Sequence, residues 1–245
     1  VVDEAGGKLW EQQLPFFKVD AKVDYFMAAD LAGDGNRALI AGSDNWRHWA
    51  FDSVGKQLWS YESVRGSTAG TAIDLDGDGR EEPIVGTEYN QLHALNPDGT
   101  ARWHVIKVGG PRLNSVLGCM LGDGKPGVVY GGAEGTVYAY DAAGQQKWSF
   151  STGDEVTCMA LADLDDDGSQ EILAGSRGFS LSALENDGAR LWRINLGEPI
   201  LSMAVADLDG DGKPEICAGT EDGHIFAVDR KGEIMYPASV GDADT

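Results

Sequence analysis

The sequence predicts an all-β protein made of five copies of one four-stranded repeat. Three recurring landmarks support this prediction: a loop rich in aspartate and glycine, a glycine that ends the strand after the loop, and an aromatic residue after the last turn. No stretch has the 3.6-residue periodicity of apolar residues that an amphipathic helix requires.

The repeat is clearest between Met203 and Tyr236. A short apolar strand leads into the loop DLDGDG at 207–212, and a second strand follows at 215–219. After a third strand, an Asp-x-x-Gly turn at 229–232 precedes the fourth. Such residues predict a hairpin turn, because aspartate caps its own backbone and glycine supplies a positive φ.

The landmarks return at a nearly constant period. The first loop position falls at residues 30, 74, 119, 163 and 207, so the steps are 44, 45, 44 and 44 residues. The closing glycines follow the same steps, and they are Gly42, Gly86, Gly131, Gly175 and Gly219. The aromatic residues are Trp10, Trp59, Trp103, Trp148, Trp192 and Tyr236. A period of this length is typical of stacked supersecondary units, and four short strands per repeat indicate the blades of a β-propeller.

The unbroken repeat predicts one domain, residues 1–245. We assign the five repeats to residues 22–64, 67–108, 113–152, 156–196 and 200–240. Residues 1–15 hold only the end of a repeat, so we expect a lone outer strand that closes a five-bladed ring against the fifth repeat. Pro237 has no amide hydrogen, which predicts a weak or edge position for the last strand of that repeat. The alternative is a fragment of a six- to eight-bladed propeller.

Composition excludes several classes of function. The formal net charge is −21 and the cations form no basic stripe, so we expect no nucleic-acid partner. No apolar run approaches the roughly 20 residues that cross a bilayer, so no membrane span is predicted. The chain starts at Val1 without a leader, which suggests a trimmed or mature product. The three cysteines are predicted to be small buried residues, with one disulfide and one free thiol as the alternative.

Three of the five loops carry a full acidic set. Aspartates stand at positions 1, 3 and 5, a glycine permits the bend, and a glutamate stands at position 9. Such an all-oxygen set suits Ca²⁺, so we predict about three calcium sites, with a backbone carbonyl from position 7 as a further ligand. The predicted ligands are Asp74, Asp76, Asp78, Arg80 and Glu82, then Asp163, Asp165, Asp167, Ser169 and Glu171, then Asp207, Asp209, Asp211, Lys213 and Glu215.

The other two loops have lost most of this set, so no calcium is predicted there. The loop that begins at Asp30 has Ala32 and Ala38 at ligand positions, and the loop that begins at Cys119 keeps only Asp123. The alternative for all the loops is that Asp-Gly stretches serve only as turns.

The acidic loops resemble those of FG-GAP or VCBS repeats, and the ending Ala-Tyr-Asp-x-x-Gly-x-x-x-Trp at 139–148 is similar to PQQ-like repeats. The first resemblance implies a calcium-binding propeller, as in integrin α-subunits and bacterial surface proteins. The second implies that the repeated tryptophan docks one blade on the next, with a row of sugar-stacking rings as the alternative. No PQQ is expected, because the ring is small and no adjacent cysteine pair is present. The chain departs from both families, since Ala-Gly-Ser or Val-Gly-Thr replaces their Gly-Ala-Pro tripeptide.

The turns between second and third strands and the connectors between repeats differ from copy to copy. We call the face that they form the variable face, and divergent loops on a rigid scaffold are where binding usually resides. The candidate ligand-binding residues are Trp46, Arg47, His48, Tyr89, Asn90, Arg112, Arg177 and His224.

These observations favour a secreted, periplasmic or cell-surface module that binds a glycan or protein partner on the variable face. No catalytic residue is assigned. The first alternative is a polysaccharide lyase, in which Arg47 neutralises a uronate and His48 acts as the base. The second alternative is a structural scaffold within a larger surface protein.

Overall fold

The computed structural model describes residues 1–17, 21–89, 91–106 and 112–239, with side chains up to Met235. The twenty strands of this part of the chain form five four-stranded antiparallel sheets, and the same residues contain no helix. The prediction of an all-β protein with five four-stranded blades is therefore confirmed. Within the described residues, no helix is present that could span a membrane.

Each sheet is a meander in which consecutive strands pair. The first sheet contains β1 (Val23–Ala29), β2 (Ala38–Ser43), β3 (Arg47–Phe51) and β4 (Gln57–Glu62). The second contains β5 (Ser67–Ile73), β6 (Glu82–Thr87), β7 (Gln91–Leu95) and β8 (Ala101–Ile106). The third contains β9 (Leu113–Met120), β10 (Pro126–Gly132), β11 (Thr136–Asp141) and β12 (Gln146–Ser151). The fourth contains β13 (Val156–Ala162), β14 (Glu171–Ser176), β15 (Ser180–Leu184) and β16 (Arg190–Asn195). The fifth contains β17 (Ile200–Ala206), β18 (Glu215–Thr220), β19 (His224–Val228) and β20 (Ile234–Ser239).

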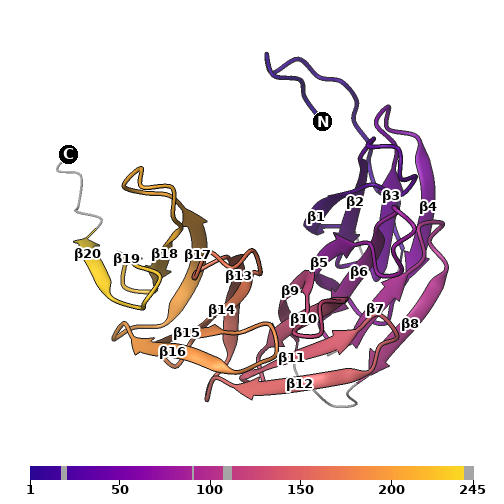
Figure 1. Cartoon of the computed structure of the whole chain (residues 1–245). Coiled ribbons are helices and arrows are strands. Elements are labelled where there is room, and N and C mark those ends of the chain that lie inside the picture. The colour runs from indigo at the N-terminus through magenta and orange to yellow at the C-terminus, as the bar shows by residue number, and fades with distance from the viewer. Residues whose placement is uncertain (18–20, 90, 107–111, 240–245) are drawn as a thin grey trace. The chain divides into compact units, whose positions relative to one another are not determined.

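The chain divides into two compact units, Val1–Gly118 and Cys119–Thr245. In the first unit, the first two sheets lie side by side, with β1 against β5 (Figure 1). In the second unit, β13 contacts β17 in the same way. These two pairs of sheets meet through their first strands, whereas the third and fourth sheets meet through β10 and β13.

The core lies in the second and third strands of the sheets. Every residue of β6, β7, β14 and β15 is buried, whereas β12 and β16 alternate between exposed and half-buried residues. A strand that is covered on both faces has no polar face, which explains short apolar runs such as the one that begins at Glu171.

The repeated glycine that closes each second strand is required by the packing of the next sheet. A β-carbon on Gly86 would lie 3.0 Å from Leu113 Cδ1, and one on Gly175 would lie 2.9 Å from Ile200 Cγ2. Each partner is the first residue of the first strand of the following sheet. Any side chain at these positions would push the two sheets apart, so the glycine period marks where sheets pack.

The repeated tryptophan docks one sheet on the next, as predicted. The indole Nε1 of Trp59 donates to Pro97 O at 3.0 Å. The ring also covers Gly99 of an Asp-x-x-Gly turn, where an added β-carbon would lie 2.6 Å from Trp59 Cδ2. The same pairs elsewhere are Trp10 with Gly55, Trp148 with Gly188, and Trp192 with Gly232.

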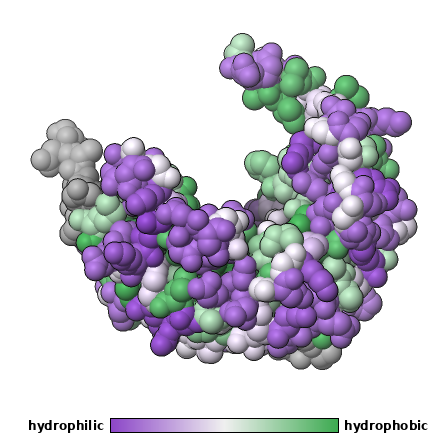
Figure 2. Space-filling view, in the orientation of Figure 1, coloured by the Kyte–Doolittle hydropathy of each residue, from purple (hydrophilic) through white to green (hydrophobic). Residues whose placement is uncertain are grey.

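The N-terminal segment keeps the end of a repeat, but its predicted strand is reduced to an isolated bridge between Val2 and Lys8. Trp10 lies on the first sheet, where its indole donates to Ser53 O at 3.1 Å. Phe16 is 71% exposed, and this segment is partly green in Figure 2. In the fifth sheet β20 holds the fourth position, so residues 1–15 do not replace it, and ring closure by these residues stays a prediction.

All three cysteines are free thiols, so the alternative with a disulfide is wrong. Cys119 is 4% exposed, as the prediction of a buried residue requires, and Cys158 and Cys217 are half-buried. Burial raises the pKa of the Cys119 thiol to about 12.

Candidate functional site

Three acidic loops join the first and second strands of their sheets and share one backbone shape. We call them the acidic loops, and they are residues 74–82, 163–171 and 207–215. Asp74 accepts the Gly77 amide at 2.7 Å and the Gly79 amide at 2.9 Å. Asp163 and Asp207 accept the two equivalent amides of their own loops at 2.7–3.0 Å. The first aspartate therefore folds each loop and brings its later carboxylates together.

The glutamate at position 9 of each acidic loop is buried against the start of the loop. These glutamates accept an amide hydrogen bond at 2.8 Å for Glu82 with Leu75, 2.6 Å for Glu171 with Leu164, and 2.7 Å for Glu215 with Leu208. Their exposed fractions are 1%, 1% and 4%. Because burial disfavours an isolated charge, a carboxylate in such a place needs donors or a cation around it.

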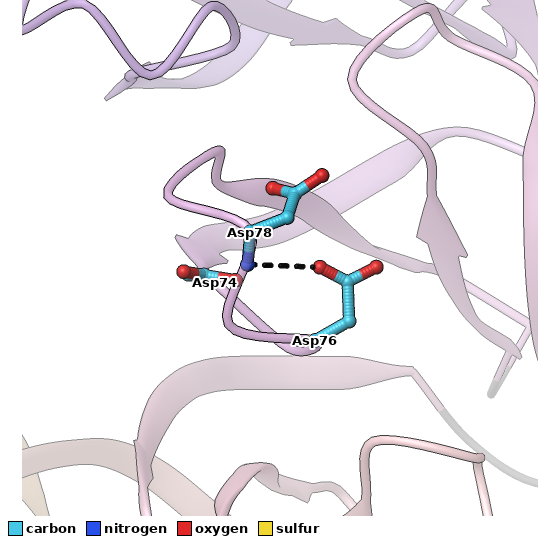
Figure 3. Close-up of side chains that lie close together, drawn as sticks. All are labelled: Asp74, Asp76 and Asp78. Carbon is cyan, nitrogen blue, oxygen red and sulfur yellow. Dashed lines mark hydrogen bonds between the residues drawn. The ribbon is translucent and has the colours of Figure 1, made fainter.

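In each acidic loop, carboxylate oxygens of three residues lie within 4.8 Å of one another. The groups are Asp74, Asp76 and Asp78, then Asp163, Asp165 and Glu171, then Asp207, Asp209 and Glu215. Oxygens on opposite sides of a bound Ca²⁺ lie about 5 Å apart, because each is about 2.4 Å from the ion. The donor sets therefore have the size and chemistry for one calcium ion each. Figure 3 shows the first group, in which the Asp78 amide donates to Asp76 at 3.3 Å.

The residues at position 7 contact the aspartate at position 5. Their amides donate at 2.8 Å from Arg80 to Asp78, 2.6 Å from Ser169 to Asp167, and 2.9 Å from Lys213 to Asp211. Arg80 differs from the other two, because its guanidinium also donates to Asp78 through Nε and Nη2. This contact lowers the pKa of Asp78. Ligation by the three carbonyls stays a prediction.

Neighbouring charge distinguishes two of the buried glutamates. Burial raises the pKa of Glu82, while the Leu75 amide and the Arg102 guanidinium act in the opposite direction. Burial also raises the pKa of Glu171 against the Leu164 amide, which lowers it. Carboxylates add to the rise at both glutamates, but no cation opposes them at Glu171 as Arg102 does at Glu82. The surroundings of Glu171 are therefore the more anionic.

The loop of the first sheet has no glutamate at position 9, and Glu81 of the adjacent acidic loop contacts it instead. Asp30 still accepts two amides of its loop at 2.8 Å, but Ala38 stands at position 9. Glu81 accepts the Asp30 amide at 2.8 Å and pairs with Arg37 at 2.6 Å.

In the third sheet, a short turn stands where the other sheets have the loop between first and second strands. β9 continues through Cys119, and the Leu121 amide donates to Lys125 O at 2.8 Å. Among the described residues, neither this turn nor the loop of the first sheet brings three acidic side chains together.

On the variable face, three side chains of the first unit form what we call the aromatic–arginine cluster. The guanidinium of Arg65 lies 5.6 Å from the ring centroid of Trp46 and 5.4 Å from that of Tyr89. Tyr89 is 45% exposed, and Arg65 is exposed as well. Trp46 and Tyr89 were predicted as ligand residues, whereas Arg65, in a connector of the variable face, was left out of the predicted set, because one cation in a connector forms no pattern.

Two members of this cluster adopt an unfavourable backbone conformation. Trp46 and Arg65 have positive φ angles of 72° and 74°. At the same turn position as Trp46, two other repeats have Gly135 and Gly223, with φ of 73° and 87°, and the fourth has Phe179, with φ of 66°. A side chain in this region costs about 1–2 kcal/mol relative to glycine. Retained strain of this kind is typical of functional positions.

Arg47 and His48 do not form the exposed pair that a lyase requires. β3 begins at Arg47, and His48 within it is fully buried. His48 Nδ1 lies 2.9 Å from Tyr25 Oη and Nε2 lies 3.2 Å from Ser63 Oγ, and burial lowers the pKa of His48 to about 3. The prediction of His48 as a ligand residue or base is therefore wrong, because this side chain belongs to the core. The Arg47 guanidinium stacks on Phe17 at 4.0 Å.

Two predicted ligand residues of the second unit are engaged by carboxylates. Arg177 pairs with Glu155 at 3.2 Å and with Glu221 at 3.5 Å. His224 Nδ1 lies 2.6 Å from Asp222 Oδ2, and its side chain is 44% exposed. Of the remaining two, Arg112 is exposed and Asn90 lies outside the described residues.

Comparison with protein families gives one match over most of the chain. The sequence family described as outer membrane protein assembly factor BamB matches residues 55–238. This match confirms the resemblance to PQQ-like repeats, whereas the FG-GAP or VCBS character of the acidic loops stays a prediction. No curated protein matches the chain by sequence.

Comparison with solved structures confirms the fold. Sqt1 of Saccharomyces cerevisiae is similar with a TM-score of 0.76 at 12% identity, over 93% of this chain and 65% of Sqt1. The V. cholerae biofilm matrix protein Bap1 gives 0.72 at 21% identity, over 94% of this chain and 42% of Bap1. BBS1N in complex with ARL6DN gives 0.68 at 12% identity, over 92% of this chain and 68% of BBS1N. At these identities the likeness shows the fold alone, and the chain spans less than two thirds of Sqt1 and of Bap1.

Proposed function

Because the chain belongs to the family of the outer membrane protein assembly factor BamB, we propose that it is a non-catalytic β-propeller module that binds a protein partner. The observation that carries this proposal is the aromatic–arginine cluster of Trp46, Arg65 and Tyr89. The setting of the module is secreted, periplasmic or cell-surface, and its acidic loops bind Ca²⁺.

The composition and geometry of the cluster support a protein partner. Tryptophan, tyrosine and arginine are the residue types enriched at the energetic centres of protein interfaces. Arg65 contacts both rings, so the three side chains lose less conformational freedom on binding than separate side chains would lose. The positive φ angles of Trp46 and Arg65 add support, because glycine at either position would relieve strain.

The names of the relatives agree with this proposal. The matching family is named for an assembly factor of outer membrane proteins, and the BBS1N structure is that of a complex with ARL6DN. Bap1 is a biofilm matrix protein, which is consistent with a surface setting.

Calcium binding is supported by the shared network of the three acidic loops. Each loop folds around its first aspartate, buries a glutamate and gathers three carboxylates. A bound ion would neutralise these carboxylates, while the chain's own amides and aspartates hold the loop in shape. No PQQ is expected.

Site-specific photocrosslinking in cells that produce the protein tests the partner proposal. The probe residue replaces Val64, which is 52% exposed and adjacent to Arg65. A matched probe replaces Val54, which is 75% exposed on the opposite, Asp-x-x-Gly side of the first sheet. Trp46→Gly, placed in the Val64 probe background, removes the ring and introduces the residue that other repeats use at this position.

We expect a discrete crosslinked protein from position 64, none of the same mass from position 54, and loss of the product with Trp46→Gly. Equal products from both positions, or a product that survives Trp46→Gly, would overturn the proposal. If the protein bound a glycan array, lost that binding with Trp46→Gly and gave no protein crosslink, the partner would be a glycan and not a protein.

A further inference from the structure

The residue before the docking aromatic of each fourth strand lies at a β-bulge. In the second sheet, Ala94 pairs with Trp103 and Leu95 pairs with Ala101, so Arg102 has no opposite residue. The other four sheets have the same irregularity. The bulged residues are Leu58, Arg102, Lys147, Leu191 and Met235. Bulges redirect a side chain, and from the second sheet onward these side chains lie near the first loop of their own sheet.

In the second sheet the bulge directs a cation onto the acidic loop. Arg102 Nη1 lies 2.8 Å from Asp76 Oδ2 and 3.4 Å from Glu82 Oε1. Glu82 is only 1% exposed, so this contact lies partly out of water, where charge-assisted hydrogen bonds are strong. Arg80 engages Asp78 in the same loop. Two arginines stand against the four predicted ligand carboxylates of this loop, a formal sum of −2, and its fifth carboxylate, Glu81, pairs with Arg37.

In the fourth and fifth sheets the bulged residue is apolar. Leu191 and Asp165 line one pocket of about 440 Å³, and Met235, Asp209 and Glu215 line another of about 240 Å³. Neither bulged side chain can neutralise a carboxylate. Arg230 and Lys231 also line both pockets, but among the described residues neither forms an ion pair with a predicted ligand carboxylate, as Arg102 does in the first acidic loop.

The buried glutamates of the three acidic loops differ in their contacts with cations. Among the described residues, the Leu164 amide donates to Glu171 at 2.6 Å, and no cation pairs with this buried side chain. Glu215 likewise accepts the Leu208 amide. Both belong to the oxygen clusters of their loops, whereas Glu82 does not belong to the cluster of the first acidic loop.

The other cations near these two loops do not replace Arg102. Arg230 pairs with Asp166, which is not a predicted ligand, at 2.7 Å. Lys213 Nζ is 4.0 Å from Asp211 Oδ2, at the limit of an ion pair.

We propose that Arg102 is a built-in counter-ion that weakens calcium binding at residues 74–82, so that 163–171 and 207–215 are the high-affinity sites. This inference rests on the proposed calcium binding by the acidic loops. Calcium affinity in such loops depends on the number of charged ligands, and Arg102 must leave Asp76 and Glu82 before an ion can use them. The loops of the second unit consequently depend on calcium for their order, while the loop of the first unit is held by its own arginine.

Two reciprocal substitutions test this inference, because the chain itself uses both residues at the bulge. Arg102→Leu introduces the residue of the fourth sheet, and Leu191→Arg introduces the residue of the second. The probe is Ca²⁺ alone, titrated by calorimetry into chelator-treated full-length protein. In the native chain we expect two tight calcium sites and a third site whose affinity is lower by a factor of roughly ten or more. Arg102→Leu should give three tight sites, and Leu191→Arg should leave one.

A calcium-free measurement separates this inference from the proposal on which it rests. In chelator, Arg102→Leu should lower the Tm and speed hydrogen exchange of the Gly77 and Gly79 amides, because the carboxylates around them lose their counter-ion. Three equal sites in the native chain, unchanged by Arg102→Leu, would refute the role of Arg102 and leave calcium binding intact. No calcium heat in any variant would refute calcium binding, while the measurements in chelator would still decide whether Arg102 neutralises the loop.

Discussion

Gly188→Ala tests the docking of one sheet on the next in the second unit. Gly188 has a φ of +90°, and an added β-carbon would lie 2.7 Å from Trp148 Cδ2. The strained backbone costs about 1 kcal/mol, and displacement of the indole costs a further 1–3 kcal/mol or so, as overpacking does. The ring cannot move freely, because its Nε1 donates to Asn186 O at 3.1 Å. We expect a total destabilisation of about 2–4 kcal/mol.

Gly197→Ala is the matched control. Gly197 has a φ of +87°, but no atom lies within 4 Å of an added β-carbon, so only the backbone cost of about 1 kcal/mol applies. Thermal unfolding followed by circular dichroism should show a Tm loss of roughly 10 °C for Gly188→Ala and about 4 °C for Gly197→Ala. In a Trp148→Ala background, the cost of Gly188→Ala should fall to that of the control. Equal losses for the two single variants would refute the reasoning.

Three further predictions concern buried groups and strain. Burial lowers the pKa of His48 to about 3 and that of His93 to about 4, so the unfolded chain binds protons below its ordinary pKa of 6.5 while the folded chain does not. Urea titrations should therefore show that the free energy of unfolding falls as the pH drops from 6.5 toward 4, by about 2 kcal/mol per histidine at pH 5. If His48→Gln and His93→Gln left this pH-dependent loss of stability unchanged, the two histidines would not be its cause. Trp46→Gly should raise the free energy of unfolding by about 1 kcal/mol, because it removes a positive-φ side chain, and a lower stability would show that the ring is needed for packing. Cys119 should resist iodoacetamide at pH 8 until urea unfolds the protein, and rapid alkylation of the native chain, seen by mass spectrometry, would show that β9 opens.

The fold was predictable because every repeat needs the same residue types at the same positions to pack on its neighbour. A glycine every 44 or 45 residues is needed where a first strand packs on the preceding sheet, as Gly175 and Ile200 show. A tryptophan at the end of each repeat is needed where it covers the next turn, as Trp59 and Gly99 show. Both residues leave a periodic trace in the sequence, since every neighbouring pair of sheets requires them.

The candidate site was predictable only in part. The carboxylates of the acidic loops were found because they stand at fixed positions within one loop, where spacing decides which oxygens meet. His48 was misplaced, because sequence alone did not reveal that β3 begins at Arg47 and buries the next side chain. Arg65 was left out of the predicted ligand residues, since its partners Trp46 and Tyr89 lie on two different turns.

The sequence by itself determined the all-β class, the number of repeats and the acidic loops, because these depend on periodicity and local spacing. Only the tertiary structure decided which side chains from different strands meet. Arg102 shows the reason: its neighbours in sequence indicate an ordinary outer strand, but a bulge turns its guanidinium toward Asp76 and Glu82, 26 and 20 residues earlier. Charge balance at the loops therefore depends on strand geometry, which a repeat pattern does not encode.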